Sequence, residues 1–375
     1  MRFPEFSGEW EEHTLSEYLE FKNGLNPDAK RIGQGLPFIS VMDILAEGVI
    51  TYNSIRGKVE ATDKEIDCFG VKNGDLLFQR SSETLEDVGR ANVYMDSRTA
   101  VYGGFVIRGR KIGNYVPLFF KYLLATPLAR KKTCRMGAGA QHFNIGQEGL
   151  SKISLSFPSV KEQEKIANLL SLIDERIATQ NKIIEDLKKL KSAISKKLLC
   201  NDKWTTYKIQ DIAEIGRGRV ISSVEIEKQR HPLYPVYSSQ TSNDGIMGYL
   251  DNYMFDGEYI TWTTDGANAG TVFYRNGKFN CTNVCGTLKI HLQFDCHFVS
   301  LVLQQATQKY VSSNLANPKL MNNTMASIKI RMPDMETQKR LSKVFQTLDS
   351  RLLVHQCTYE MYLREKQYLL NQMFI

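Results

Sequence analysis

Several residues of the kind that bind metal ions lie close together in the second half of the chain. The segment Cys281-x3-Cys285-x5-His291-x4-Cys296-His297 contains three cysteines and two histidines. Zinc sites use these side chains, and the spacing of the first two cysteines falls in the usual range. However, these two cysteines flank a strand-like stretch, and free cysteines such as Cys296 often pack in a hydrophobic core. We therefore expect no metal site, and zinc binding at this segment stays an alternative.

Motifs for catalysis are missing from the sequence. It has no G-x-x-x-x-G-K-[ST] loop, which argues against nucleotide hydrolysis, and no Asp/Asn-Pro-Pro-aromatic segment, which is the signature of amino-methyltransferases. Glu20-Phe21-Lys22 has the spacing of a nuclease E-x-K motif but lacks an evident partner aspartate. The run Asp265–Gly270 suits a turn between strands better than a metal or phosphate loop. We expect the chain to have no catalytic activity.

The composition is that of an ordinary globular protein with a modest basic excess. The 375 residues are 42% hydrophobic and 24% charged, with a net charge of +7. This length suffices for two or more domains, and the charge is compatible with a polyanionic partner. The sequence contains no run of about 18 apolar residues, Met1–Glu5 lacks the apolar core of a signal peptide, and the seven scattered cysteines fit a reducing compartment. We therefore expect a cytoplasmic protein that does not contact a membrane.

The sequence contains a long internal repeat, and the elements that it forms must position any functional side chains. The segment Pro158–Leu199 matches Pro333–Phe374 at a single offset of 175 residues, without a gap. The matched polar pairs are Gln163 with Gln338, Asp174 with Asp349, and Arg176 with Arg351. A long internal period of this kind indicates two copies of one structural unit.

Both copies have the pattern of long amphipathic helices. Their apolar residues recur at steps of three, four or seven, which makes a narrow stripe suited to one partner helix. A capping box of Ser159 and Glu162 predicts one helix start, and Asp334 predicts the other. We expect the two helices to pair as an antiparallel coiled coil through these residues: Ile166, Ile173, Ile177, Gln180, Leu187, Ile194, Leu341, Leu348, Leu352, His355, Tyr362 and Leu369.

Polar residues interrupt the stripe at matched positions. Gln180 matches His355, and Lys191 matches Lys366. In a pair of helices related by a pseudo-twofold axis, residues near the middle lie opposite their own counterparts. We therefore hypothesise that Gln180 faces His355 and helps to fix the register, as buried polar residues of coiled coils do. The alternative is that both lie at a solvated flank of the seam.

The segments before the two helices are expected to be mostly β. In the first, short apolar runs alternate with Gly, Asn and Asp turn signals; one helix is predicted at Val116–Lys132 and a glycine-rich loop at Arg135–Asn144. The second repeats this plan with a helix at Phe298–Val311 and a loop at Ser312–Asn323. The predicted fold is α+β, with two mostly-β globular domains, two long helices in an antiparallel coiled coil, and a pseudo-twofold internal repeat. The predicted limits are 1–157 and 201–332 for the globular domains, and 158–200 and 333–375 for the helices.

In this combination the whole sequence resembles the specificity subunits of type I restriction–modification systems. The opening Trp10-(x4)-Leu15 reappears as Trp204-(x4)-Ile209, and the helix starts share the pattern P-x(4)-Q-x(10)-D-x-R from Pro158 and from Pro333. The resemblance implies two target recognition domains, each reading one half of a split, asymmetric sequence in double-stranded DNA, with the helices as spacers. It further implies two methyltransferase subunits and restriction/translocase subunits as partners, in DNA methylation and phage defence. S-adenosylmethionine, ATP and Mg are then expected on those partners, with no cofactor in this chain.

If the resemblance holds, DNA-contacting residues can be proposed. Phosphate contacts position a protein on DNA, and polar side chains on loops read base edges. Candidate phosphate ligands in the first domain are Arg108, Arg110, Lys111, Arg130, Lys131, Lys132 and Arg135, and candidate base readers are Gln141, His142 and Asn144. In the second domain the candidates are Arg217, Arg219, Lys319, Asn322 and Asn323, with Asp265 and Asn268 from the glycine-rich turn. The alternative for each is an ordinary solvated surface residue.

These features are compatible with three kinds of function. The favoured one is a non-catalytic DNA-specificity subunit that positions methyltransferase and restriction subunits at a bipartite site. The alternative is a non-catalytic protein-interaction scaffold with two binding heads on a coiled coil. A specificity half fused to methylase or nuclease domains is disfavoured by the missing motifs and by the chain end after the second helix.

Overall fold

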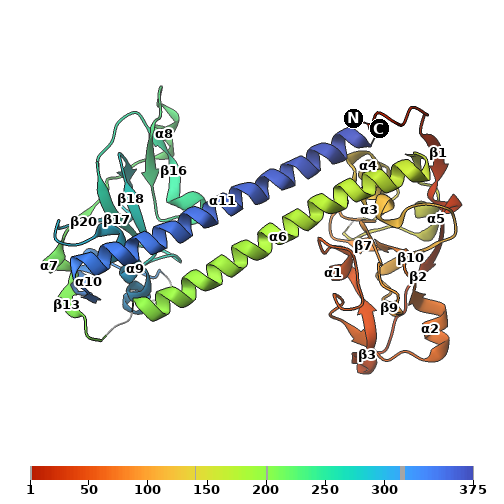
Figure 1. Cartoon of the computed structure of the whole chain (residues 1–375), viewed down its shortest axis with the longest axis horizontal. Helices are drawn as coiled ribbons and strands as arrows, with labels where there is room; N and C mark the ends of the chain where they lie inside the picture. The colour runs from red at the N-terminus through yellow and green to blue at the C-terminus, as the bar shows by residue number, and fades with distance from the viewer. Residues whose placement is uncertain (1, 140, 200–201, 313–316, 375) are drawn as a thin grey trace. The chain divides into compact units, whose positions relative to one another are not determined.

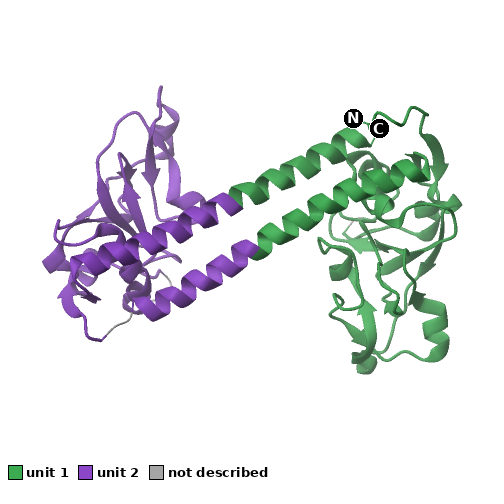
Figure 2. Ribbon diagram, viewed as in Figure 1, with its two compact units in different colours: residues 1–182, 356–375 green, residues 183–355 purple. Residues whose placement is uncertain are grey.

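The computed structural model describes residues 2–139, 141–199, 202–312 and 317–374 (Figure 1). By packing, the chain divides into two compact units, Met1–Lys182 with Gln356–Ile375, and Ile183–His355 (Figure 2). Among the described helices, none combines the length and the apolar composition that a membrane crossing requires. Residues 200 and 201, at a predicted domain limit, and residues 313–316 of the predicted Ser312–Asn323 loop lie outside the described residues.

The first unit is built on short sheets that are antiparallel apart from the parallel pairing of β3 with β9. Its largest sheet has the order β2-β10-β6-β8, and a second pairs β4, β3, β9 and β5. The strands are β1 (Glu11–Thr14), β2 (Leu19–Asn23), β3 (Ile32–Ile39), β4 (Lys58–Val59), β5 (Gly70–Val71), β6 (Leu76–Gln79), β7 (Ser81–Ser82), β8 (Ala91–Val93), β9 (Ala100–Tyr102), β10 (Val106–Lys111), β11 (Phe143–Asn144) and β12 (Ser154–Phe157). β1 pairs with β12 and β7 with β11.

The second unit repeats this strand order. Its four-stranded sheet has the order β14-β20-β17-β18, β13 pairs with β21, and β16-β15-β19 form a third sheet. The strands are β13 (Thr205–Lys208), β14 (Ala213–Arg217), β15 (Tyr234–Tyr237), β16 (Ile246–Leu250), β17 (Glu258–Thr263), β18 (Val272–Asn276), β19 (Asn280–Cys281), β20 (Cys285–Ile290) and β21 (Lys329–Met332). The shared order supports the repeat that the sequence predicts.

The short helices cover these sheets. They are α1 (Val41–Ile44), α2 (Asp63–Phe69), α3 (Pro117–Ala125), α4 (Pro127–Cys134) and α5 (Gln147–Ser151) in the first unit, and α7 (Ile209–Ile212), α8 (Ser223–Glu227), α9 (Cys296–Ala306) and α10 (Asn322–Ser327) in the second. The prediction of one helix at Val116–Lys132 is wrong, because α3 and α4 are separate. Pro127 disfavours a helical conformation at the preceding residue, and Thr126 is accordingly extended (φ −67°, ψ 151°). The helix predicted at Phe298–Val311 is α9 followed by a 3-10 turn at Thr307–Tyr310.

The two long helices are confirmed. They are α6 (Val160–Leu198) and α11 (Met335–Met373), of 39 residues each. Each start is capped by the predicted residue, since the Ser159 hydroxyl accepts a hydrogen bond from the Glu162 backbone N–H (3.4 Å) and the Asp334 carboxylate accepts one from the Thr337 N–H (2.9 Å). Only this half of the predicted capping box forms, because the Glu162 carboxylate binds Arg2 and not the Ser159 N–H. This carboxylate is buried and makes two contacts of 2.7 Å with the Arg2 guanidinium.

Within each unit, segments of both long helices lie side by side and antiparallel (Figure 2). In the first unit, Ile166 and Leu170 of α6 share a hydrophobic cluster with Leu370 and Met373 of α11. In the second, α6 and α11 contribute to a cluster that contains Ile194, Leu341 and Phe345. Five of the predicted pairing residues are buried: Ile166, Ile173, Ile177, Leu341 and Leu348. The other seven are half-buried: Gln180, Leu187, Ile194, Leu352, His355, Tyr362 and Leu369.

Matched ion pairs join the helices in the two units. Asp174 binds Lys366 in the first unit (2.6 Å), and Asp349 binds Lys191 in the second (2.5 Å). Because Asp349 is the repeat counterpart of Asp174, and Lys366 that of Lys191, the same contact is made twice with the roles of the helices exchanged. That exchange is what an antiparallel pair of repeated helices requires. The predicted pairing of Gln180 with His355 joins the two units and stays a prediction.

The matched glutamines attach each long helix to its globular domain. The side-chain oxygen of Gln163 accepts a hydrogen bond from the Val116 N–H before α3 (3.0 Å), and its amide donates to the Pro158 carbonyl (2.9 Å). Gln338 accepts from the Asp295 N–H before α9 (3.0 Å) and donates to the Pro333 carbonyl (2.8 Å). Both glutamines are buried. The matched glutamines of the repeat, Gln163 and Gln338, therefore connect each long helix to its globular domain.

We expect Gln163→Leu and Gln338→Leu each to lower the free energy of unfolding by about 1–3 kcal/mol, because each leaves a backbone N–H and a carbonyl without their partner. Denaturant unfolding followed by circular dichroism measures the change. The control is Gln346→Leu at an exposed position of α11, for which we expect a change within about 0.5 kcal/mol. Equal effects of the three substitutions would contradict the connector role.

Candidate nucleic-acid interface

Three backbone hydrogen bonds recur at the same place in the two globular domains. In the first domain they are Leu25 N–H to Tyr102 O (2.9 Å), Arg80 N–H to Phe105 O (2.9 Å) and Ile145 N–H to Arg80 O (3.0 Å). In the second domain they are Arg219 N–H to Cys281 O (3.2 Å), Thr264 N–H to Val284 O (3.0 Å) and Leu320 N–H to Thr264 O (2.9 Å). The first bond of each set joins the segment beyond β2 or β14 to the end of β9 or β19. The other two join the residue beyond β6 or β17, Arg80 or Thr264, to the turn before β10 or β20 and to the predicted reading loop or the residue that follows it. We call this region the loop edge of each domain.

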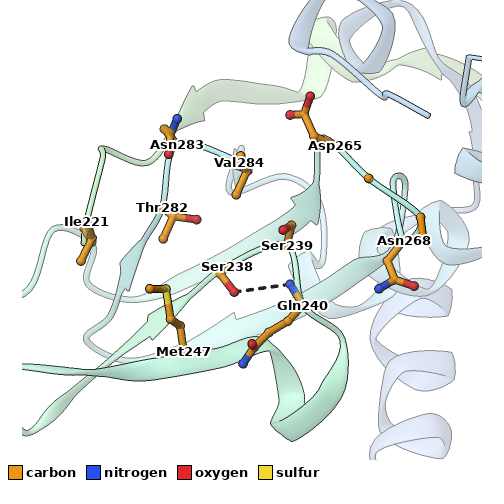
Figure 3. A pocket seen from close by; sticks show the side chains of 12 residues that line it. Ile221, Ser238, Ser239, Gln240, Met247, Asp265, Asn268, Thr282, Asn283 and Val284 are labelled. Atoms are coloured by element: carbon orange, nitrogen blue, oxygen red, sulfur yellow. Dashed lines mark hydrogen bonds between the residues drawn. The ribbon is translucent and has the colours of Figure 1, made fainter. Parts of the chain in front are cut away.

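The loop edge of the second domain encloses a polar concavity of about 490 Å³ (Figure 3). Hydroxyl, amide and carboxylate groups dominate its lining, with a few apolar side chains between them. The lining side chains that Figure 3 labels are Ile221, Ser238, Ser239, Gln240, Met247, Asp265, Asn268, Thr282, Asn283 and Val284. Such a surface offers donors and acceptors of the kind that read base edges.

The structure brings the predicted residues Asp265, Asn268 and Lys319 to this edge. Asp265 forms an ion pair with Lys319 (3.6 Å) and accepts a hydrogen bond from the Thr264 hydroxyl (2.6 Å). Gly266 has a φ of +92°, which only glycine adopts readily, and its N–H donates to the Pro318 carbonyl (3.0 Å). The predicted turn at Asp265–Gly270 is thereby confirmed, and Asn268 is exposed beside it.

Four further predicted residues lie on the same edge. Arg217 ends β14, and its guanidinium lies 3.7 Å from the sulfur of Met321. The Asn322 amide donates to the Gly216 carbonyl (3.5 Å), and Asn323 is exposed next to it. Arg219 is also exposed, but it forms an ion pair with Glu225. These residues extend the polar surface around the concavity.

Sequence reasoning missed the segment Ser238–Gln240 and the turn Thr282–Val284 of this concavity. The run of Ser, Gln, Thr, Asn and Asp at 238–244 is a signal for a polar loop. However, nothing local to it indicates that the fold places it beside Asp265. The missed residues add two hydroxyl groups and two amides from Ser238, Ser239, Gln240 and Asn283 to the candidate reading surface.

In the first domain the predicted base readers lie at the equivalent edge. Asn144 is in β11, which pairs with Ser81–Ser82 of β7, and the Ser81 hydroxyl donates to its side-chain oxygen (2.5 Å). Gln141 and His142 are exposed in the loop before it. Phe105, the counterpart of Val284 in the repeated hydrogen bonds, has a side chain that is 68% exposed. The two edges thus share backbone geometry but differ in their side chains.

Two of the predicted phosphate ligands are internal. Arg108 is only 6% exposed, and its guanidinium donates to the Gly70 carbonyl (2.7 Å). Arg110 donates to the same carbonyl (2.6 Å) and forms an ion pair with the buried Asp75 (3.1 Å). Burial raises the pKa of the Asp75 carboxyl, against the opposing effect of these two positive charges. The prediction that Arg108 and Arg110 bind phosphate is therefore wrong, because both guanidinium groups are bound to Gly70 inside the domain and Arg110 also pairs with Asp75.

Other predicted phosphate ligands of the first domain also make internal contacts. Arg130 donates to the Val88 carbonyl (2.6 Å), Lys132 to that of Ser154 (2.8 Å) and Lys111 to that of Tyr115 (2.7 Å). The sequence shows that these side chains are charged, but it does not show which way they point, so it could not predict these contacts. Lys111, Lys131 and Arg135 are exposed and stay candidates for phosphate contact.

The alternative zinc ligands are not brought together. Cys281 and Cys285 lie in one hydrophobic cluster and Cys296 in another, and His297 is hydrogen-bonded to Ser342 (2.8 Å). Within the described parts of the chain, no group of three or more His, Cys, Asp or Glu side chains could hold a metal ion.

A family model for the type I restriction modification DNA specificity domain matches residues 7–189 and 201–358. The chain belongs to this family. The two matches place one copy of the domain on each half of the repeat, which agrees with the two similar globular domains and with the resemblance inferred from sequence.

Individual relatives agree with this assignment. Over 231 residues the chain is 37% identical to a Mycoplasma pneumoniae protein named as type I specificity subunit S.MpnORF201P, which covers 60% of this chain and 96% of that protein. It is 39% identical over 178 residues to the specificity subunit of the type I restriction enzyme MpnII from the same organism, covering 47% of this chain and 53% of that one. The fold is similar to the S subunit structure from M. genitalium, with a TM-score of 0.69, 16% identity, and coverage of 98% and 96% of the two chains.

Proposed function

We propose that this chain is the DNA-specificity subunit of a type I restriction–modification complex. Each globular domain reads one half of a bipartite site through its loop edge, and the paired helices set the gap between the halves. The observation that carries this proposal is the pair of loop edges, in which the same three hydrogen bonds support different side chains. Two domains that share these backbone hydrogen bonds but present different side chains are suited to a DNA site whose two halves differ in sequence.

The chain itself performs no chemistry in this proposal. Its role is to position two methyltransferase subunits and the restriction/translocase subunits on DNA, and those partners bind S-adenosylmethionine, ATP and Mg. The candidate surface suits this role, because its hydroxyl, amide and carboxylate groups are spread over open loop edges from which they can contact DNA. The restriction system as a whole would act in the cytoplasm, where its DNA is.

Binding of DNA across a salt series tests the proposal. We expect the affinity of the chain with its methyltransferase partner to fall steeply as salt rises, since phosphate contacts release counterions. Affinity that is independent of salt, or absent with the partner present, would favour the protein-interaction scaffold instead. Methylation mapping in a genome that carries both subunits would identify the site itself.

Lys131→Met and Lys319→Met are expected to weaken binding by a similar factor on every DNA sequence. Each should reduce the slope of log affinity against log salt by about one, because each removes one phosphate contact. Filter binding at several salt concentrations measures both quantities. The control is Lys188→Met at an exposed position of α6, which should leave the slope unchanged. A loss of affinity confined to one DNA sequence would assign these lysines to base reading.

A further inference from the structure

A buried arginine reaches from the sheet of the second domain into the loop beside its polar concavity. Arg275 lies in β18, and its side chain is 3% exposed. Its guanidinium stacks on Tyr237 (3.6 Å to the ring centroid) and Phe273 (4.4 Å), and its Nε–H donates to the Thr261 hydroxyl (3.3 Å). A buried guanidinium that only filled space would be replaceable by an apolar side chain, often without loss of stability.

The two terminal nitrogens of the Arg275 guanidinium both bind Asp244. Nη1 binds the Asp244 carboxylate (2.5 Å), and Nη2 donates to the Asp244 backbone carbonyl (2.7 Å). This double contact uses the planar donor fork of arginine, which lysine does not have. The Asp244 side chain is 64% exposed, so the pair joins the interior of the domain to a surface loop.

The loop that Arg275 holds has an unusual backbone. Asn243, Asp244 and Gly245 are successive residues with positive φ values of 49°, 53° and 79°. Asparagine and aspartate tolerate this region better than other non-glycine residues, but it still costs free energy and persists only when surrounding contacts impose it. The backbone bond from Ser238 N–H to Gly245 O (2.9 Å) closes the same loop.

This loop carries Ser238, Ser239 and Gln240, which line the concavity in Figure 3. We propose that Arg275 is a positioning residue for base reading by the second domain. By fixing Asp244, it holds the loop Ser238–Gly245 in the conformation that presents Ser239 and Gln240 to DNA. This inference rests on the proposed function, and it adds a specificity-determining loop and the residue that shapes it.

The test uses the full chain in complex with its methyltransferase partner. Methylation rates are measured on the cognate site and on sites with one base changed in either half, and thermal unfolding is recorded for each variant. We expect Arg275→Met to reduce discrimination about tenfold at the half-site that depends on residues 201–332, which is what one base contact supplies. Discrimination at the other half-site should not change.

Two conservative variants separate positioning from folding. Arg275→Lys retains the charge without the fork, and we expect it to recover only part of the discrimination. Asp244→Asn removes the carboxylate but suits the positive φ and keeps the backbone carbonyl that Arg275 binds. It should therefore lower the melting temperature less than Arg275→Met does and still lose discrimination. Lys329→Met, at an exposed strand position of the same unit, is the matched control for loss of a charge.

The outcomes are distinguishable. If Asp244→Asn and Arg275→Met kept wild-type discrimination, or lost it equally at both half-sites, the positioning role would be refuted while the proposed function stood. If the wild-type complex showed no base preference at either half-site, the proposed function would fail, and the inference with it.

Discussion

Inserting seven residues into each long helix is expected to move the recognised half-sites apart by about three base pairs. Seven helical residues add about 10 Å, and base pairs follow one another every 3.4 Å or so along DNA. A heptad keeps the apolar stripe in phase. The insertions belong between Lys182 and Ile183 and between His355 and Gln356, where the two compact units meet along the chain.

Methylation of the original site should fall by about 100-fold, since one half-site is then out of reach and its share of specific binding is lost. Methylation rates on DNA sites with gaps lengthened by zero to five base pairs measure the shift. Both half-site sequences should stay the same. A matched control places four residues in each helix, which breaks the phase of the stripe and should destabilise the pair. An unchanged gap in the heptad variant would show that the helices do not set the spacing.

Replacing residues 201–332 with the corresponding domain of another family member is expected to change one half-site completely and leave the other intact. The physical reason is that each loop edge is formed within one unit, by backbone contacts that do not depend on the other domain. Sequencing of methylated sites before and after the exchange measures this. The effect is total at one half-site, and therefore larger than that of any single substitution.

A second chimera, in which residues 183–355 are exchanged, controls for the contacts between the globular domain and the long helices. Gln338 binds the backbone before α9, and Phe345 packs in the same cluster as Phe298. Exchange of residues 183–355 keeps these contacts within the donor segment, whereas exchange of 201–332 requires the donor to fit them. Both chimeras should recognise the same new half-site. A change in both halves of the site would disprove independent reading.

Local signals determined the long helices. The stripe of apolar residues and the prolines before it predicted Pro158–Leu199 and Pro333–Phe374, and the helices span Val160–Leu198 and Met335–Met373. Periodicity and capping act over neighbouring residues, so a single sequence contains that information. The same holds for the turn at Asp265–Gly270. Where a local signal was overlooked, as at Pro127, the prediction failed, and one expected helix became α3 and α4.

Tertiary structure decided which polar side chains face outward. Arg108 and Arg110 have the same sequence signature as surface cations, but they bind Gly70 and Asp75 inside the domain. The repeat revealed the matched aspartates and lysines of the helices without showing that they pair.

By itself, then, the sequence determined the two-copy architecture, the paired helices and the family, because repetition, periodicity and motif spacing are properties of the chain. Only the fold decided that Asp174 pairs with Lys366, that Ser238–Gln240 lies beside Asp265, and that Arg275 reaches Asp244. These are contacts between residues distant in sequence, and their geometry exists only once the strands and helices have packed.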